Sequence, residues 1–113
     1  MQNVLWTQLC GQVETILVSV DPNANSTRVH LRKPNDALLL DINRESFAGE
    51  LSASSLGWLD LLVFDLTAEN FESAAVYQAA GIQWETDPEL DHKLEHFFEY
   101  FALCWDSRSQ PIK

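Results

Sequence analysis

The stretch of residues 87–105 carries an apolar stripe at helical spacing, and few folds can accommodate such a stripe. Its members recur every three, four or seven residues: Leu90, Leu94, Phe97, Phe98, Phe101, Cys104 and Trp105. This spacing places them on one side of an α-helix, which must bury them against another element. Asp87 is a natural N-cap, Pro88 suits the first helical position, and Glu89 favours the positive end of the helix dipole. We therefore expect a long C-terminal helix packed on a sheet.

Alternating and continuous apolar segments upstream predict the strands of that sheet. Residues 13–20 and 27–32 alternate in polarity and flank a turn-rich segment, residues 21–26, so they predict an antiparallel hairpin. Residues 37–42 and 59–66 are apolar on both faces, which is typical of interior strands. We expect the second of these to lie centrally and to be covered on both sides.

Three segments have weaker patterns with competing interpretations. Residues 3–12 suit a short helix ended by Gly11, although a strand also fits. Residues 43–56 favour a short helix that crosses the sheet, because apolar residues recur there at intervals of four. Residues 67–81 favour a helix, with a strand over 75–80 as the alternative.

These elements together predict one α+β domain over residues 1–113, in which residues 106–113 form a frayed tail. The expected architecture is a single-domain sandwich: a four- to five-stranded, mostly antiparallel sheet with the long C-terminal helix packed on it. The alternative is a mixed α/β sheet, because the 16 residues between 37–42 and 59–66 leave room for a crossover helix. The chain is 46% hydrophobic, which suffices for a packed core.

The chain is strongly acidic, with 17 Asp and Glu against 7 Lys and Arg and a net charge of −10. Residues 58–113 hold 11 acids and 3 bases, so 3 − 11 = −8 of this charge belongs to the second half. Such a balance excludes binding to nucleic-acid backbones and to anionic lipid. No apolar run is long enough to span a membrane. The expected partner is therefore a protein, with a basic surface.

The cellular compartment is predicted from two weak signals. The N-terminus lacks the basic region and apolar stretch of a secretory signal. Cys10 and Cys104 are too few for a disulfide scaffold, and Cys10 has no basic neighbour in the sequence. We expect two reduced thiols in a cytoplasmic protein, with Cys104 as a small core residue in the apolar stripe.

One segment matches a catalytic pattern in its letters. His92, Glu95 and His96 fit the H-x-x-E-H arrangement of inverted zinc proteases. A catalytic zinc needs a third protein ligand and a cleft, yet only 17 residues follow His96. The helical pattern also places these side chains opposite the apolar stripe. We interpret them as a solvated helix face, and we predict neither a metal nor a cofactor.

A second segment resembles the phosphoacceptor strand of response-regulator receiver domains. Asp65 ends a strongly apolar strand, as the phosphorylated aspartate does in that family. The resemblance would imply a pair of acids after the first strand and a lysine on a late strand. Here Asp21 stands alone, Lys93 lies in the last predicted helix, and Lys113 lies in the tail. We interpret Asp65 as the end of a strand, and with no nucleophile motif or glycine-rich phosphate loop in the chain we predict no catalytic residues.

The function predicted from these observations is binding. We expect a non-enzymatic small acidic protein, such as an inhibitor or immunity-type protein of bacterial kind that acts against a basic partner. The alternatives are an accessory or assembly subunit or chaperone of a larger complex and, less favoured, a small metal-dependent enzyme that uses the H-x-x-E-H segment. The predicted contact residues combine one exposed indole with the acids around the last helix: Trp84, Glu85, Asp87, Glu89, Asp91, Glu95 and Glu99. The basic strand face of Arg28, His30 and Arg32 either protects a sheet edge or docks an acidic partner.

Overall fold

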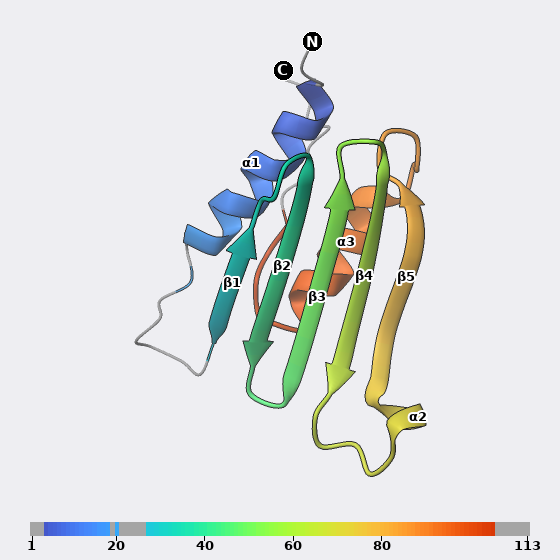
Figure 1. Ribbon diagram of the computed structural model, residues 1–113. Coiled ribbons are helices and arrows are strands. Elements are labelled where there is room, and N and C mark those ends of the chain that lie inside the picture. The colour runs from blue at the N-terminus through green and yellow to red at the C-terminus, as the bar shows by residue number, and fades with distance from the viewer. Residues whose placement is uncertain (1–3, 19, 21–26, 106–113) are drawn as a thin grey trace.

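The fold is a five-stranded antiparallel sheet with its first and last helices packed on one face (Figure 1). This computed structural model describes residues 4–18, 20 and 27–105. The strands lie side by side in chain order: β1 (Arg28–Arg32), β2 (Ala37–Arg44), β3 (Phe47–Ser54), β4 (Trp58–Asp65) and β5 (Ala75–Gln83). The helices are α1 (Val4–Val18), α2 (Phe71–Ala74) and α3 (Leu90–Glu99). The predicted α+β class is confirmed. The mixed sheet is wrong, because a strand rather than a crossover helix joins β2 to β4.

Helix α1 covers 15 residues and replaces the predicted first hairpin. The helix expected over 3–12 exists, but it continues through Gly11 instead of ending there. Leu9, Val13 and Ile16 are buried and share one helical face at spacings of four and three. Burial of this face against the sheet outweighs the strand propensity of the β-branched residues, so the strand over 13–20 is wrong. The predicted turn at 21–26 lies outside the described residues.

Strands β1 and β2 form the first hairpin of the sheet. Their register pairs His30 with Asp41 and Leu31 with Leu40. Alternation along β1 is as predicted, because Arg28, His30 and Arg32 are exposed while the residues between them are half-buried. Strand β1 is therefore a cationic edge of the sheet, paired with β2 and not with residues 13–20.

Strand β3 occupies the segment for which a helix was predicted. Gly49, Leu51 and Ala53 are buried at alternate positions, a period of two that a helix cannot provide. Gly49 is required at its position, because a Cβ there would lie 2.5 Å from Cζ of the fully buried Phe101. Residues 43–56 thus form the end of β2, a turn, the strand β3 and the start of a second turn.

Strand β4 is second from the edge and is covered on one face only. Leu59, Leu61 and Val63 are buried under the helices. Leu62 and Phe64 point to the opposite face and stay partly exposed. None of the described helices covers that face, so the prediction of a central strand covered on both sides is wrong.

The second part of residues 67–81 is strand, because β5 begins at Ala75, and this confirms the alternative interpretation of 75–80. The helix predicted over residues 67–81 is reduced to the four residues of α2. Asn70 Oδ1 accepts a hydrogen bond from Ser73 N at 2.9 Å at its start. Strand β5 then pairs with β4 and contains two bulges, each an extra residue relative to β4. One bulge uses Gly81, whose φ is +68° and whose N–H donates to Asp60 Oδ1 at 2.7 Å. A left-handed residue of this kind favours glycine.

Helix α3 is shorter than the predicted C-terminal helix. Its buried face carries Leu90, Leu94, Phe97 and Phe98. After Glu99 the chain turns through Ala102, whose φ is +58°, and residues 101 and 105 are buried without being helical. This turn leaves Cys104 exposed, so its predicted place in the core is wrong. The predicted tail, residues 106–113, lies outside the described residues.

One hydrophobic cluster joins the helices to the inner face of the sheet. It includes Leu9 and Val13 from α1, Leu40 from β2, and Leu94 and Phe97 from α3. Among the residues described, no helix is both long and apolar enough to cross a membrane.

Candidate functional site

Four segments that are distant in sequence meet at one end of the molecule, uppermost in Figure 1. They are the start of α1 (residues 4–6), the β1–β2 turn (33–36), the β3–β4 turn with its flanks (55–58) and the β5–α3 connection (83–89). We call this end the apex. It is the candidate site, because it gathers four of the seven exposed large hydrophobic side chains among the described residues.

The apolar part of the apex consists of side chains that a folded chain ordinarily buries. Val4 is 68% exposed, Leu5 41%, Leu56 88% and Trp58 43%. The other large hydrophobic side chains exposed in the described residues are Val18, Leu66 and Val76, which lie outside the apex. Such a concentration of apolar surface at one place is typical of an interaction site.

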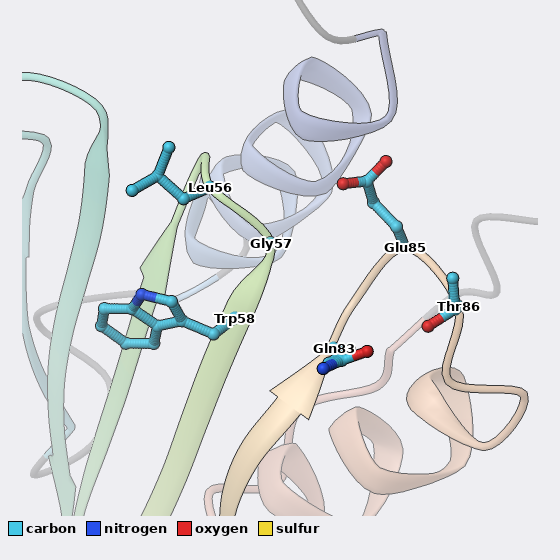
Figure 2. A pocket seen from close by; sticks show the side chains of 6 residues that line it. All are labelled: Leu56, Gly57, Trp58, Gln83, Glu85 and Thr86. Atoms are coloured by element: carbon cyan, nitrogen blue, oxygen red, sulfur yellow. The ribbon is translucent and has the colours of Figure 1, made fainter.

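A pocket of about 420 Å³, which we call the turn pocket, lies at the β3–β4 turn (Figure 2). Leu56 and Trp58 project to one side of Gly57, and Gln83, Glu85 and Thr86 come from the β5–α3 connection on the other side. Gly57 has a φ of +122°, a conformation that L side chains rarely adopt. The turn that presents Leu56 and Trp58 therefore depends on glycine at its tip.

Trp84 holds this arrangement together from inside the protein. Its side chain is fully buried, and its indole N–H donates to Ser54 O at 2.8 Å. Its backbone N–H donates to Gly57 O at 3.0 Å, and its ring lies 5.6 Å from the ring of Trp6. The expected exposed indole at Trp84 is wrong. Trp84 instead joins three segments of the apex, and Trp58 is the exposed tryptophan there.

A second depression, a groove of about 730 Å³, runs along α1 beside the β1–β2 turn. Its lining comes from one stripe of α1, from that turn and from the β3–β4 turn: Trp6, Thr7, Cys10, Gly11, Glu14, Lys33, Asn35, Asp36, Ala37 and Ser55. Ser55 N donates to Asp36 O at 2.8 Å, so the two turns are joined where the groove approaches the pocket.

The groove contains an ion pair and a thiol. Lys33 Nζ donates to Glu14 Oε2, and this hydrogen bond raises the pKa of the Lys33 ammonium. Burial raises the pKa of the Cys10 thiol, although Lys33 acts in the opposite direction. Lys33 is thus the basic neighbour that Cys10 lacks in the sequence. With a raised pKa, Cys10 is a poor nucleophile at neutral pH.

The predicted acidic contact residues divide into two groups. Glu85 and Glu89 are exposed at or beside the apex. Asp87 accepts from Lys93 Nζ at 2.6 Å and from Glu89 N at 2.8 Å, and these bonds lower its pKa. Asp91 accepts from the Trp105 indole N–H at 2.9 Å. Asp87 and Asp91 therefore help to hold the β5–α3 region in place.

Glu95 and Glu99 lie on the exposed face of α3, together with His92. His96 packs against Tyr77, with ring centroids 4.6 Å apart, and its Nδ1 lies 3.9 Å from Glu99 Oε1. Within the part of the chain that the structure describes, no three His, Cys, Asp or Glu side chains are grouped so that they could hold a metal.

Asp65 stabilises the chain just after β4. Its Oδ1 accepts from Thr67 N at 2.9 Å and from the Thr67 hydroxyl at 2.6 Å, and both bonds lower the pKa of this carboxyl. A side chain engaged in this way fits the interpretation that Asp65 ends the strand.

Sequence patterns found only the acidic part of the apex. Leu56 falls at the end of the helix predicted over residues 43–56, and Trp58 falls between that helix and the strand predicted over residues 59–66, so neither was predicted as a contact residue. The signal that could have identified them is Ser55-Leu56-Gly57 between two strand-like segments, since an apolar residue at the tip of a hairpin must face solvent.

Searches against protein-family models, curated proteins and solved structures give no match for this chain.

Proposed function

We propose that this is a non-enzymatic, cytoplasmic binding protein that acts as an inhibitor or immunity-type protein against a partner with a basic surface. The partner binds at the apex. The observation that supports this proposal is the position of the exposed Leu56 and Trp58 beside Glu85 around one pocket. Apolar anchors with a charged rim are the usual composition of a protein–protein interface.

The two parts of the apex contribute differently to binding. Burial of a large apolar side chain contributes roughly 1.5–3 kcal/mol, so Leu56 and Trp58 can supply a substantial part of the affinity. Glu85 and Glu89 lie at the edge, where acidic side chains mainly speed association with a basic partner and select its orientation. Because Trp84 holds the turn and the connection together, little ordering is needed when the partner binds.

The second candidate function is an accessory or assembly subunit, or a chaperone, of a larger complex. It is favoured by the open face of the sheet, where Leu62 and Phe64 are partly exposed and Val76 on β5 is 39% exposed. A subunit in a complex could cover this face.

The proposal is tested by affinity capture from the native host, with wild-type protein and apex variants as baits. Leu56→Ser, Trp58→Ser and Glu85→Lys should each lose the protein that the wild type captures. Matched controls at the opposite end of the molecule are Leu66→Ser, where the leucine is 64% exposed, and Glu69→Lys. Both controls should retain the partner. A partner captured equally by the three apex variants would contradict binding at the apex.

A further inference from the structure

We infer that the groove along α1 and the turn pocket together form one track for an extended segment of the partner, in which a cationic residue stands next to apolar ones. This inference rests on the proposed function and adds what kind of partner structure the apex receives. It follows from the shape of the groove, from its position next to the pocket at the β3–β4 turn, and from the charge of its lining.

The floor of the groove is open because of a glycine in the middle of α1. Thr7, Cys10, Gly11 and Glu14 form one stripe of the helix, at spacings of three, four and seven. A Cβ built on Gly11 would meet no atom within 4 Å. Glycine in a helix interior is destabilising relative to alanine, and neither φ nor a close contact requires it here. What the glycine provides is space on the groove side of α1.

The groove and the turn pocket are lined by adjacent residues of the β3–β4 turn. Ser55 lines the groove, and its neighbour Leu56 lines the pocket. The stripe from Thr7 to Glu14 rises about 10 Å along the helix, which matches about three residues of extended chain. A segment of three residues in the groove would then bring the next residues toward the β3–β4 turn, where Leu56 lines the turn pocket.

The lining of the track selects a cation. Its ionisable side chains at neutral pH are three acids, Glu14, Asp36 and Glu85, and one base, Lys33, which gives 1 − 3 = −2. Lys33 and Glu14 already pair with each other. The remaining acids, Asp36 and Glu85, are exposed at the β1–β2 turn and beside the turn pocket, respectively. A segment with Arg or Lys near apolar side chains complements this lining, whereas a second copy of this chain would bring a net charge of −10 toward it.

The experiment uses a random library of 12-residue peptides displayed on phage and selected against the wild-type protein. We expect enrichment of peptides that combine Arg or Lys with an adjacent apolar residue. Synthetic copies of these peptides are then titrated against two variants. Gly11→Leu fills the groove from a helix position with free space, and it should weaken binding by at least tenfold. Gln8→Leu adds a leucine to an exposed position of α1 outside the groove, and it should leave binding unchanged.

Loss of binding in Gly11→Leu cannot be assigned to unfolding, because replacement of a mid-helix glycine raises helix propensity. Thermal unfolding of both variants checks this point. The inference is overturned if no peptide is enriched, or if Gly11→Leu binds the selected peptides as the wild type does. A dimer in sedimentation velocity that Gly11→Leu dissociates would assign the groove to a second copy, and would also overturn it. If Gly11→Leu still captures the host partner while Leu56→Ser and Trp58→Ser do not, the track fails and the proposed function stands.

Discussion

Individual residues around the apex fall into those that hold the site and those that are free to bind. Trp84 and Asp87 were predicted as contact residues, yet the structure engages both inside the protein. Glu85 lines the pocket as an exposed side chain. Whether a tryptophan or an acid at the apex stabilises the fold or is available for binding therefore depends on its hydrogen-bond partners, which the sequence does not reveal.

Asp87→Ala should lower the free energy of unfolding by about 1 kcal/mol, because Glu89 N loses its acceptor at the start of α3 and Lys93 loses its partner. The effect should depend on pH. Since the folded state lowers the pKa of Asp87 from its ordinary value near 3.8, the stabilisation is present above that value and is lost as the pH falls through the folded pKa. Urea unfolding of both proteins at pH 7 and at about pH 2 measures the difference, which should be smaller at the lower pH.

The control for this prediction is Glu89→Ala, which removes a neighbouring exposed carboxylate whose side chain makes no N-cap hydrogen bond. Its effect on the free energy of unfolding should be within about 0.5 kcal/mol of zero. An Asp87→Ala effect that persists undiminished at acid pH would show that the carboxylate charge is not what stabilises the start of α3.

At the scale of elements, segments with a single strong period were predictable from the sequence, whereas segments with two compatible periods were not. The alternation in residues 28–32 and the apolar run in 59–65 gave β1 and β4, and the stripe beginning at Leu90 gave α3. Residues 13–18 carry a strand-like alternation and also the helical spacing of Val13 with Leu9 and Ile16. Tertiary burial on the sheet decided in favour of the helix.

Long-range strand pairing explains why the helices predicted over residues 43–56 and 67–81 are wrong. Phe47 and Leu51 stand four residues apart, which suggests a helix, but β3 gains hydrogen bonds from both β2 and β4. Strand β5 carries small residues with little pattern, and its bulges break the alternation of its side chains. The candidate site was predicted only in part for the same reason. Glu85 was predicted from its charge, whereas Leu56 and Trp58 could be identified only once the β3–β4 turn was known.

The bulge at Gly81 makes a prediction for β5. Asp60→Ala should lower the free energy of unfolding by about 1–2 kcal/mol, because Gly81 N loses the acceptor that completes the bulge. Asp60→Asn keeps an acceptor oxygen and should remain close to wild type. Urea unfolding measures the stability, and hydrogen exchange should show faster exchange of the Gly81 amide in the alanine variant only. Equal stability of the two variants would mean that the bulge forms without this bond.

Across the whole molecule, basic, uncharged and acidic side chains lie on different parts of the surface. Strand β1 presents Arg28, His30 and Arg32 at one edge of the sheet, while β5 at the other edge carries no charged residue. The face of the sheet opposite the described helices mixes partly exposed apolar residues with acids such as Glu50. The acidic excess is concentrated in residues 58–113, which include the β5–α3 connection and the outer face of α3. If the proposed partner has a basic surface, this side of the protein should attract it before it contacts the apex.

Charge and contact should consequently affect different rate constants. Glu95 and Glu99 lie on the exposed face of α3 outside the apex lining, and reversal of both to Lys changes the net charge from −10 to −6, since each reversal adds two. Association with the captured partner should slow several-fold in Glu95→Lys/Glu99→Lys, and in the wild type it should slow between low and physiological salt, where charges beyond about 8 Å are screened. Dissociation should change little in both cases.

Trp58→Ser should do the opposite, with faster dissociation and an almost unchanged association rate. Surface plasmon resonance over a series of salt concentrations measures both constants. An association rate indifferent to salt and to the double reversal would mean that the acidic face of α3 serves solubility alone.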